Sequence, residues 1–330
     1  MTNERSLRVA VAGCGTMGKL YASVLTRMDD VELAGFYARR SESAIDAAAS
    51  FGTRLFASYE ELLAEADIDV VCITLPTYLH RQYAVQAAER GKHVICEKPM
   101  ALTLEDTEAM MRASERYGTR LLVGHVLRFS PEYRNLRGHV RSGKIGNVGV
   151  GHARRASLHP PSDSWFKNEE LSGGVLFDLM IHDIDFMRWT LGEVRSVYAS
   201  LTTAPGIEYA NATLRFASGA IVNLEAHWGY PGPFLAEVEL AGQSGVMRCS
   251  NLNGQPLIVR QTESQRTAGE GVHIPSFLLR KDPYEAEIEH FIACIRTGIE
   301  PVVSAEDASR AVEIALAAGR SARTGLPQKL

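Results

Sequence analysis

The chain has 330 residues, of which 45% are hydrophobic and 22% are charged, and its formal net charge is −4. A chain of this length and composition is expected to form two domains with substantial apolar cores. The small negative charge, without a long run of either sign, excludes the basic face of a nucleic-acid-binding protein.

The first 125 residues alternate between strand and helix patterns. Short apolar runs predict six strands, at Leu7–Ala12, Val31–Tyr37, Arg54–Phe56, Asp69–Leu75, His93–Cys96 and Arg120–Gly124. Helical patterns lie between them, at Met17–Met28, Ser41–Phe51, Tyr59–Ala66, Tyr78–Arg90 and Thr103–Tyr117. Apolar strands separated by helices predict a parallel sheet buried on both faces, in the doubly wound α/β arrangement.

The pattern changes after about residue 126. A helix is predicted at Val175–Trp189, and two more close the chain at Tyr284–Thr297 and Ala305–Thr324. Between them lie predicted strands separated by turn residues, at Val194–Leu201, Tyr209–Phe216, Ala220–Trp228, Phe234–Gly242, Gly245–Cys249 and Leu257–Arg260. This succession predicts an α+β domain built on a largely antiparallel open sheet. We therefore expect one domain at residues 1–126 and a second at residues 127–330.

The cysteines and the amino terminus bear on the compartment. The five cysteines are odd in number and form no C-x-x-C pair, which argues against a disulfide framework and against a structural zinc site. The first residues are charged rather than apolar, and no apolar run approaches the roughly 18 residues of a membrane helix. The sequence predicts a cytoplasmic protein that carries no metal and binds neither membrane nor nucleic acid.

A glycine-rich turn joins the first strand to the first helix. It reads Gly13-Cys14-Gly15-Thr16-Met17-Gly18 and fits the pattern G-x-G-x-x-G. Between a strand and a helix, these glycines allow a tight turn, a close approach of a pyrophosphate to the backbone, and close packing of the helix. The turn predicts an NAD(P)-binding Rossmann domain, with Gly13, Gly15, Thr16, Met17 and Gly18 at the cofactor. The alternative is an ordinary glycine-rich turn.

The end of the second strand bears on the choice of cofactor. An acidic residue is expected at Tyr37 or Ala38 if the ribose carries a free 2′-hydroxyl, and none is present. The sequence continues with Arg39, Arg40 and a serine, which could bind a 2′-phosphate. We therefore expect NADP to be preferred over NAD, with Ala38, Arg39 and Arg40 near the ribose. The alternative is that the two arginines only begin a surface helix.

Two further motifs carry the expected chemistry. Lys98 follows the fifth strand, at the carboxyl edge of the sheet where ligands bind, and Pro99 restricts its conformation and allows a cis bond. A lysine there can donate to a substrate hydroxyl or to a developing alkoxide, although a lone loop lysine is often only solvated. Asp178 and His182 are four residues apart and share a helix face. Such a pair can be structural, or the histidine can act as a base near neutral pH.

Seven motifs together resemble the Gfo/Idh/MocA family, named for glucose–fructose oxidoreductase, inositol dehydrogenase and a rhizopine-catabolism protein. They are the glycine turn, Leu75-Pro76 with His80, Gly91–Val94, Glu97–Pro99, Arg128-Phe129 with Pro131, Gly143–Gly146, and the block Gly173–Asp185. The resemblance covers essentially the full length. It implies that Lys98 is an active-site residue and that His182 is the general acid/base, with Asp178 and Lys98 beside it.

The resemblance also implies further contacts. Cofactor contacts are expected from Leu75, Pro76, Thr77, His80, Glu97 and Lys98, although Thr77 stands where the family usually has asparagine. Substrate contacts are expected from Lys98, Arg128, Trp165, Asp178 and His182. Asp185 is expected to bond the histidine or the backbone, while His125 and Tyr284 are weaker candidates.

The resulting functional prediction is hydride transfer between NAD(P) and a hydroxyl or keto carbon of a sugar or cyclitol. The resemblance implies a homodimer or homotetramer that forms through the sheet of the second domain. Two alternatives remain open at this point. One is a non-enzymatic NAD(P)-binding sensor or regulator on the same fold. The other is a glycosidase-like enzyme that holds NAD tightly and shows no net redox change.

Overall fold

The computed structural model describes residues 5–38, 42–161, 164–252, 257–261 and 281–330. They form two compact units. Unit 1 consists of Met1–His125 and Tyr284–Ser309, and unit 2 consists of Val126–Pro283 and Arg310–Leu330. The chain therefore passes between the units three times, and the segment Tyr284–Ser309 packs with unit 1.

Unit 1 contains one parallel sheet. Its strands are paired in the order β3-β2-β1-β4-β5-β6. They are β1 (Leu7–Ala12), β2 (Val31–Tyr37), β3 (Arg54–Phe56), β4 (Val70–Ile73), β5 (His93–Glu97) and β6 (Leu121–Gly124). This order is that of a doubly wound dinucleotide-binding sheet, which confirms the predicted fold class. The strands are buried on both faces, and every residue of β4 has an exposed fraction of 0%.

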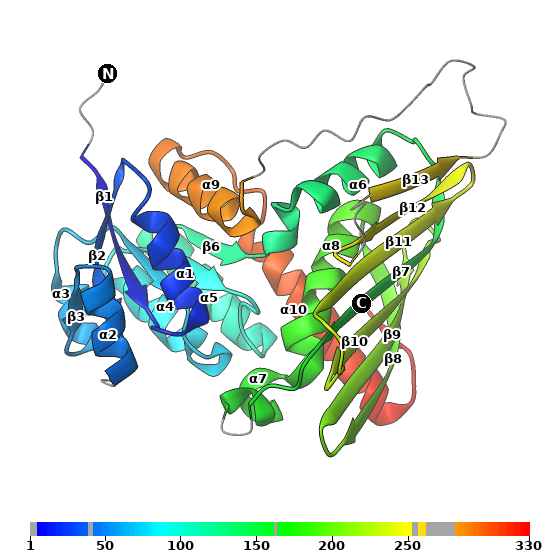
Figure 1. Cartoon of the computed structure of the whole chain (residues 1–330), viewed down its shortest axis with the longest axis horizontal. Coiled ribbons are helices and arrows are strands. Elements are labelled where there is room, and N and C mark those ends of the chain that lie inside the picture. Colours follow the sequence, from blue (N-terminus) through cyan, green and yellow to red (C-terminus); the bar gives the residue numbers. More distant parts are fainter. Residues whose placement is uncertain (1–4, 39–41, 162–163, 253–256, 262–280) are drawn as a thin grey trace. The chain divides into compact units, whose positions relative to one another are not determined.

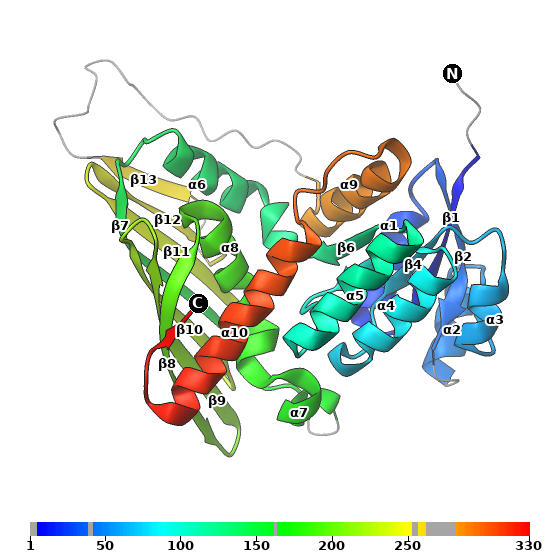
Figure 2. The same ribbon diagram turned by 180° about the vertical axis from the view of Figure 1, so that it is seen from behind.

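Helices cover both faces of this sheet, with α1 on one face and α4 and α5 on the other (Figures 1 and 2). The helices between the strands are α1 (Thr16–Leu25), α2 (Glu42–Ser50), α3 (Tyr59–Ala64), α4 (His80–Glu89) and α5 (Leu104–Tyr117). Helix α1 ends three residues before its predicted end. The reason is that the N–H groups of Arg27 and Met28 bind carbonyls three residues back instead of four, which tightens the last turn.

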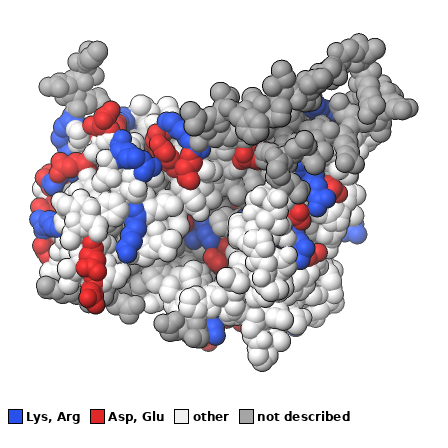
Figure 3. Space-filling view, viewed as in Figure 1, with Lys and Arg blue, Asp and Glu red and all other residues white. Residues whose placement is uncertain are grey.

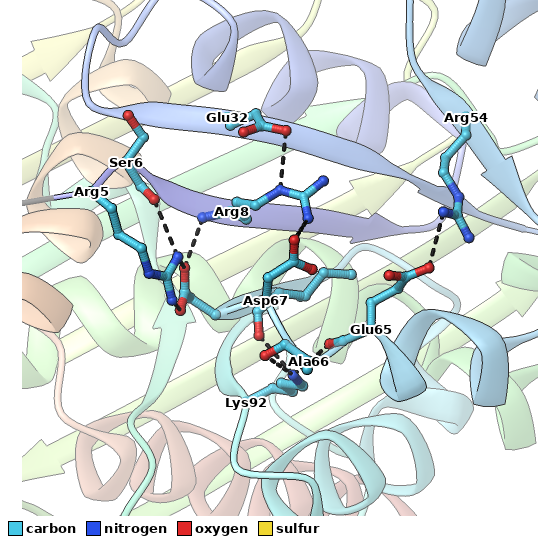
Figure 4. A network of polar contacts seen from close by, with 11 residues as sticks. Arg5, Ser6, Arg8, Glu32, Arg54, Glu65, Ala66, Asp67 and Lys92 are labelled. Carbon is cyan, nitrogen blue, oxygen red and sulfur yellow. Dashed lines mark hydrogen bonds and ion pairs between the residues drawn. The ribbon is translucent and has the colours of Figure 1, made fainter.

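A polar network holds the amino-terminal ends of the strands in unit 1 (Figure 4). Lys92 is 6% exposed, and its ammonium donates to the carbonyl oxygens of Glu65 and Ile68 at 2.8 Å each. Burial lowers the pKa of Lys92, against the opposing effect of nearby carboxylates, the largest from Asp69. Asp69 in turn accepts two hydrogen bonds from Arg5 at 2.6 and 2.8 Å. Lys92, part of the Gly91–Val94 motif, thus has a structural role.

The surface of unit 1 carries both signs of charge. On the face drawn in Figure 3, acidic and basic side chains are intermingled over the helices and strands of this unit. Ion pairs such as Arg54–Glu61 and Arg112–Glu108 join oppositely charged side chains of this unit.

Unit 2 contains an eight-stranded mixed sheet in the order β13-β12-β11-β7-β10-β9-β8-β14. All pairs are antiparallel except β7–β10, which is parallel. The strands are β7 (Val148–Ser157), β8 (Val194–Ala204), β9 (Ile207–Phe216), β10 (Ile221–Trp228), β11 (Leu235–Gly242), β12 (Gly245–Ser250), β13 (Leu257–Gln261) and β14 (Gln328–Lys329). The largely antiparallel sheet was predicted, whereas β7 and β14 were not among the predicted strands.

Helices lie on one face of this sheet. They are α6 (Pro131–Arg141), α8 (Ile181–Leu191) and the unit 2 part of α10 (Ala305–Thr324), with the short α7 (Glu169–Ser172) at one end (Figures 1 and 2). Buried side chains of β9 and β10 point to the helical face, among them Leu214, Leu224 and Trp228. On the other face Val150, Tyr198 and Ile207 are each 44% exposed. No helix of the described chain covers that face.

Helix α9 (Pro283–Thr297) belongs to unit 1. Its Glu287 and Tyr21 of α1 are both fully buried. The burial of Tyr21, together with the charges of Glu97 and Glu287, raises the pKa of Tyr21 well above its ordinary value. Arg120, just before β6, donates to the carbonyl oxygens of Gly298 and Ile299 at 2.6 and 3.0 Å. The segment after α9 is therefore bonded to the same sheet as the first 125 residues.

Membrane-spanning helices, metal-binding clusters and disulfides are absent from the described residues. Among them, no helix combines the length and hydropathy needed to cross a bilayer. The same residues contain no group of three His, Cys, Asp or Glu side chains placed to hold a metal ion. All five cysteines are free thiols.

Candidate active site

The glycine turn after β1 has the geometry that its motif predicts. Gly13 has φ +120°, and its N–H donates to the carbonyl oxygen of Tyr37 at 2.7 Å. A Cβ on Gly18 would lie 2.0 Å from the carbonyl oxygen of Gly13, so α1 packs directly on the turn. By contrast, a Cβ on Gly15 would meet no heavy atom within 4 Å, and no side chain caps the amino end of α1. This open, uncapped helix terminus fits the pyrophosphate of a dinucleotide.

The end of β2 is described only in part. Tyr37 closes the strand, and its hydroxyl lies 3.2 Å from that of Tyr83 on α4. Ala38 follows the strand and is half-buried. Arg39 and Arg40, on which the expected NADP preference depends, lie outside the described residues.

The loops after β4 and β5 are joined by a buried histidine. His80 is 1% exposed, and its ring nitrogens lie 2.9 Å from the carbonyl oxygen of Pro99 and 2.8 Å from that of Leu75. Burial lowers the pKa of His80, although these carbonyls oppose the shift. Both ring nitrogens therefore already have protein partners, and the expected contact of His80 with the cofactor stays a prediction. Thr77, in the same loop, is 4% exposed.

Lys98 lies directly after β5, and the Lys98–Pro99 peptide bond is cis. The backbone N–H of Lys98 donates to Glu97 Oε2 at 3.1 Å, and Glu97 is 8% exposed. Strands β1, β4 and β5 are neighbours in the sheet, and their carboxyl ends lead into the glycine turn, the Leu75–His80 loop and Lys98. The predicted cofactor residues that are described therefore come together at one edge of the sheet, apart from the buried His80 side chain.

In unit 2, Asp178 and His182 form a strip on an otherwise buried helix. From Gly174 to Met187, these two are the only residues that are not buried. Asp178 lies in a π-helical turn, Leu176–Met180, and His182 in the first turn of α8. A π turn holds more residues than an α turn, so it brings residues four apart closer to the same direction. The predicted pair thus faces outward together.

The start of this helix is held by a glutamate that the sequence did not single out. Glu208 accepts a hydrogen bond from the backbone N–H of Val175 at 2.6 Å. Gly174 has φ +65°, and a Cβ there would lie 2.4 Å from Glu208 Oε1. Glu208 lies opposite the buried Trp228 in the β9–β10 pair, so it points to the helical face of the sheet. Burial raises the pKa of Glu208, and the charges of Glu169 and Asp178 add to the shift.

Two buried ion pairs flank His182 along the chain. Arg155 on β7 donates to both carboxylate oxygens of Asp183, at 2.8 and 3.0 Å. Arg128 donates to both oxygens of Asp185, at 2.6 and 2.9 Å. Asp185 was expected to bond His182 or the backbone, and it binds Arg128. The guanidinium of Arg128 is 1% exposed, and its expected contact with substrate stays a prediction.

Trp165, His125 and Tyr284 are the other predicted candidates for the site. Trp165 is half-buried, and its ring stacks on that of Phe166 with centroids 4.0 Å apart. Phe166 meets Trp228 edge-on at 6.2 Å. His125 is 1% exposed, and Tyr284 is a half-buried residue of α9 in unit 1. Lys98 belongs to unit 1, whereas Asp178 and His182 belong to unit 2.

Two family patterns match the chain. Residues 7–125 match the pattern described as "Oxidoreductase family, NAD-binding Rossmann fold". Residues 133–248 match the Gfo/Idh/MocA C-terminal domain. Together they cover more than half of the chain, one in each unit.

Full-length relatives agree with this assignment. The chain is 30% identical to an inositol 2-dehydrogenase of Rhizobium meliloti, over 96% of this chain and 97% of the relative. It is 29% identical to the scyllo-inositol 2-dehydrogenase (NAD⁺) of Bacillus subtilis, over 99% of this chain and 97% of the relative. The crystal structure of a myo-inositol dehydrogenase from Corynebacterium glutamicum has a TM-score of 0.80 at 27% identity, covering 98% of this chain and 99% of that one.

Proposed function

This chain belongs to the Gfo/Idh/MocA family of NAD(P)-binding oxidoreductases, and from that premise we propose that it oxidises a ring hydroxyl of a cyclitol or sugar, or catalyses the reverse reduction. The observation that carries the proposal is the strip of Asp178 and His182 on a helix that is otherwise buried. A base and a carboxylate that are only half-buried on such a helix are placed to act on a bound molecule.

The residues of unit 1 fit a dinucleotide. The open space at Gly15 and the uncapped amino end of α1 would receive the pyrophosphate, with Gly13, Thr16, Met17 and Gly18 around it. Leu75, Pro76, Thr77, Glu97 and Lys98, at the same sheet edge, would line the nicotinamide side. When bound, the nicotinamide accepts or supplies the hydride.

His182 is proposed as the group that takes the hydroxyl proton during oxidation and returns it during reduction. Imidazole groups in general exchange a proton near neutral pH, which suits both directions of the reaction. Asp178, one turn before His182, orients the imidazole and stabilises its charged form. The ammonium of Lys98 donates to the substrate oxygen as negative charge develops there.

The substrate class is proposed from the relatives, whose names specify inositols. A cyclitol or sugar presents several hydroxyl groups, which suit hydrogen-bonding side chains such as Asp178 and His182. We also propose a preference for NADP, because Ala38 stands where an acid would bind a free 2′-hydroxyl. The dinucleotide-binding function is proposed for residues 1–126, and substrate binding and oligomerisation for residues 127–330.

The experiment that tests this function uses the purified chain with NAD⁺ or NADP⁺ and a panel of inositols and sugars, and follows the absorbance of the reduced nicotinamide. Lys98→Ala is expected to retain cofactor binding and to lose turnover. Lys329→Ala, which removes an exposed lysine of β14, is the matched control. Turnover that survives in Lys98→Ala contradicts the mechanism. Bound cofactor that never leaves, with no net redox change, contradicts the proposed reaction.

A further inference from the structure

The direction of His182 depends on how helix α8 is rotated about its axis. His182 is the only residue between Leu179 and Met187 that is not buried. A small rotation of the helix would therefore turn the imidazole toward its buried surroundings. Whatever fixes this rotation also fixes the direction of the proposed acid/base.

Two arginines bind aspartates of this helix on either side of His182. Successive residues of an α-helix are about 100° apart around the axis. Asp183 therefore lies about 100° to one side of His182, and Asp185, three residues on, lies about 60° to the other side. All three residues are within α8, so this spacing applies to them.

Each arginine binds its aspartate through two parallel hydrogen bonds. Arg155 and Asp183 are 4% and 1% exposed, and Arg128 and Asp185 are both 1% exposed. Each guanidinium donates through Nε and Nη2 to the two oxygens of its carboxylate, at 2.6 to 3.0 Å. Two parallel hydrogen bonds hold a fixed relative orientation, which one bond does not. The two arginines come from different places, β7 and the turn Val126–Arg128 that follows β6.

Stability alone is a weak reason to bury these charges. Removing an ion pair from water costs several kcal/mol per ion, and apolar replacements of the same volume are often neutral or stabilising. For Arg155, burial alone would lower the pKa, and the charge of Asp183 more than offsets it, so the pKa is raised.

We propose that Arg155–Asp183 and Arg128–Asp185 are positioning pairs that set the rotation of α8 and thereby the direction of His182. The inference rests on the proposed role of His182 as the acid/base. In this assignment Arg128 acts through Asp185 and not by touching the substrate.

The test replaces one pair in two ways. Arg155→Met combined with Asp183→Leu removes both charges while keeping apolar volume, so the fold is expected to survive. Arg155→Lys keeps the positive charge but cannot form the two parallel hydrogen bonds. Both variants are expected to lose about tenfold or more in kcat, because a displaced acid/base works poorly. The dissociation constant for NAD(P)H is expected to stay unchanged, since its proposed site lies in unit 1.

The matched control is an ion pair between Arg188 of the same helix and a residue just beyond the end of that helix. Arg188 binds Glu193 at 2.7 Å, with Glu193 54% exposed, so Glu193→Gln is expected to leave kcat unchanged. A kcat within twofold of wild type in both Arg155 variants overturns the proposal. If the doubly replaced variant does not fold, Arg155→Lys decides alone.

A second readout does not need turnover. The imidazole NMR signals of His182, assigned by their loss in His182→Gln, are expected to be single in the wild type and broadened or doubled in Arg155→Lys. A loss of kcat with unchanged His182 signals overturns the proposal, because the pair would then act elsewhere. If the wild type oxidises no polyol but the signals change as expected, the proposed function fails and the positioning role stands.

Discussion

The carboxylate of Glu208 accepts a hydrogen bond from the backbone N–H of Val175 at 2.6 Å. Val175 lies three residues before Asp178 in the chain. We expect Glu208→Ala to lower the free energy of unfolding by about 1–2 kcal/mol, because it leaves a helix-terminal donor without its acceptor. Glu208→Gln keeps an acceptor oxygen and should cost less. Urea denaturation of the two variants checks this order, and equal losses would contradict it.

The same residue predicts a pH dependence. Burial raises the pKa of Glu208 above its ordinary value of 4.5, so the folded state binds more protons than the unfolded state in the window above that value. The part of the stability that comes from this raised pKa is therefore present below the unfolded pKa and is lost as pH rises through the folded pKa. Glu208→Gln should make stability less dependent on pH in this window. If the difference in unfolding free energy between the wild type and Glu208→Gln does not change with pH, the raised pKa of Glu208 is contradicted.

Two glycines of the turn after β1 should respond differently to the same substitution. Gly18→Ala places a Cβ 2.0 Å from the carbonyl oxygen of Gly13, and we expect a loss of about 2 kcal/mol or more in stability. Gly15→Ala meets no atom within 4 Å, so its stability should be unchanged. Its methyl group would occupy the proposed pyrophosphate site and weaken NAD(P)H binding about tenfold, by roughly 1.4 kcal/mol. Thermal melts and fluorescence titrations separate the two effects.

The cofactor preference is tested at Arg39. If its guanidinium binds the 2′-phosphate, Arg39→Ala should weaken NADPH binding by about 1.5–3 kcal/mol and leave NADH binding nearly unchanged. Arg112→Ala, on the exposed surface of α5, is a suitable control. Tighter binding of NADH than of NADPH by the wild type would show that the proposed preference is wrong.

The uncovered face of the unit 2 sheet is proposed as the contact between copies of the chain. Val150 and Tyr198 are each 44% exposed on that face, and a charge at Val150 would have to be desolvated in such a contact. Val150→Arg should therefore reduce the mass measured by light scattering to that of a monomer. Ile45→Arg, at an exposed position of α2, should not. An unchanged mass for Val150→Arg would exclude this face.

Local sequence patterns were sufficient to predict the parallel sheet of unit 1. They were insufficient to predict every strand of the mixed sheet of unit 2. The strands of unit 1 are apolar on both faces, so each one is recognisable by itself. Strand β7 was missed because it contains two glycines and two adjacent arginines, which weaken a strand pattern. Its Gly151 is explained by packing, since a Cβ there would lie 2.9 Å from the side chains of Leu240 and Val222.

In the candidate active site, too, local sequence patterns reveal some residues and not others. Asp178 and His182 were found because four-residue spacing on a helix is a local signal. The partners that hold their helix are distant in sequence, with Arg155 28 residues from Asp183 and Glu208 33 residues from Val175. No local pattern connects such residues, and a lone glutamate at the start of a strand carries no signal of its partner.

The passage of the chain between its two units three times restricts how the enzyme can be taken apart. A fragment that stops at His125 contains all six parallel strands, yet it lacks helix α9 and the carbonyl oxygens that Arg120 binds. The buried faces of Tyr21 and Glu287 would be separated in the same cut. Exchange of cofactor modules between relatives therefore needs three junctions, after residues 125, 283 and 309, so that residues 284–309 move with the sheet on which they pack.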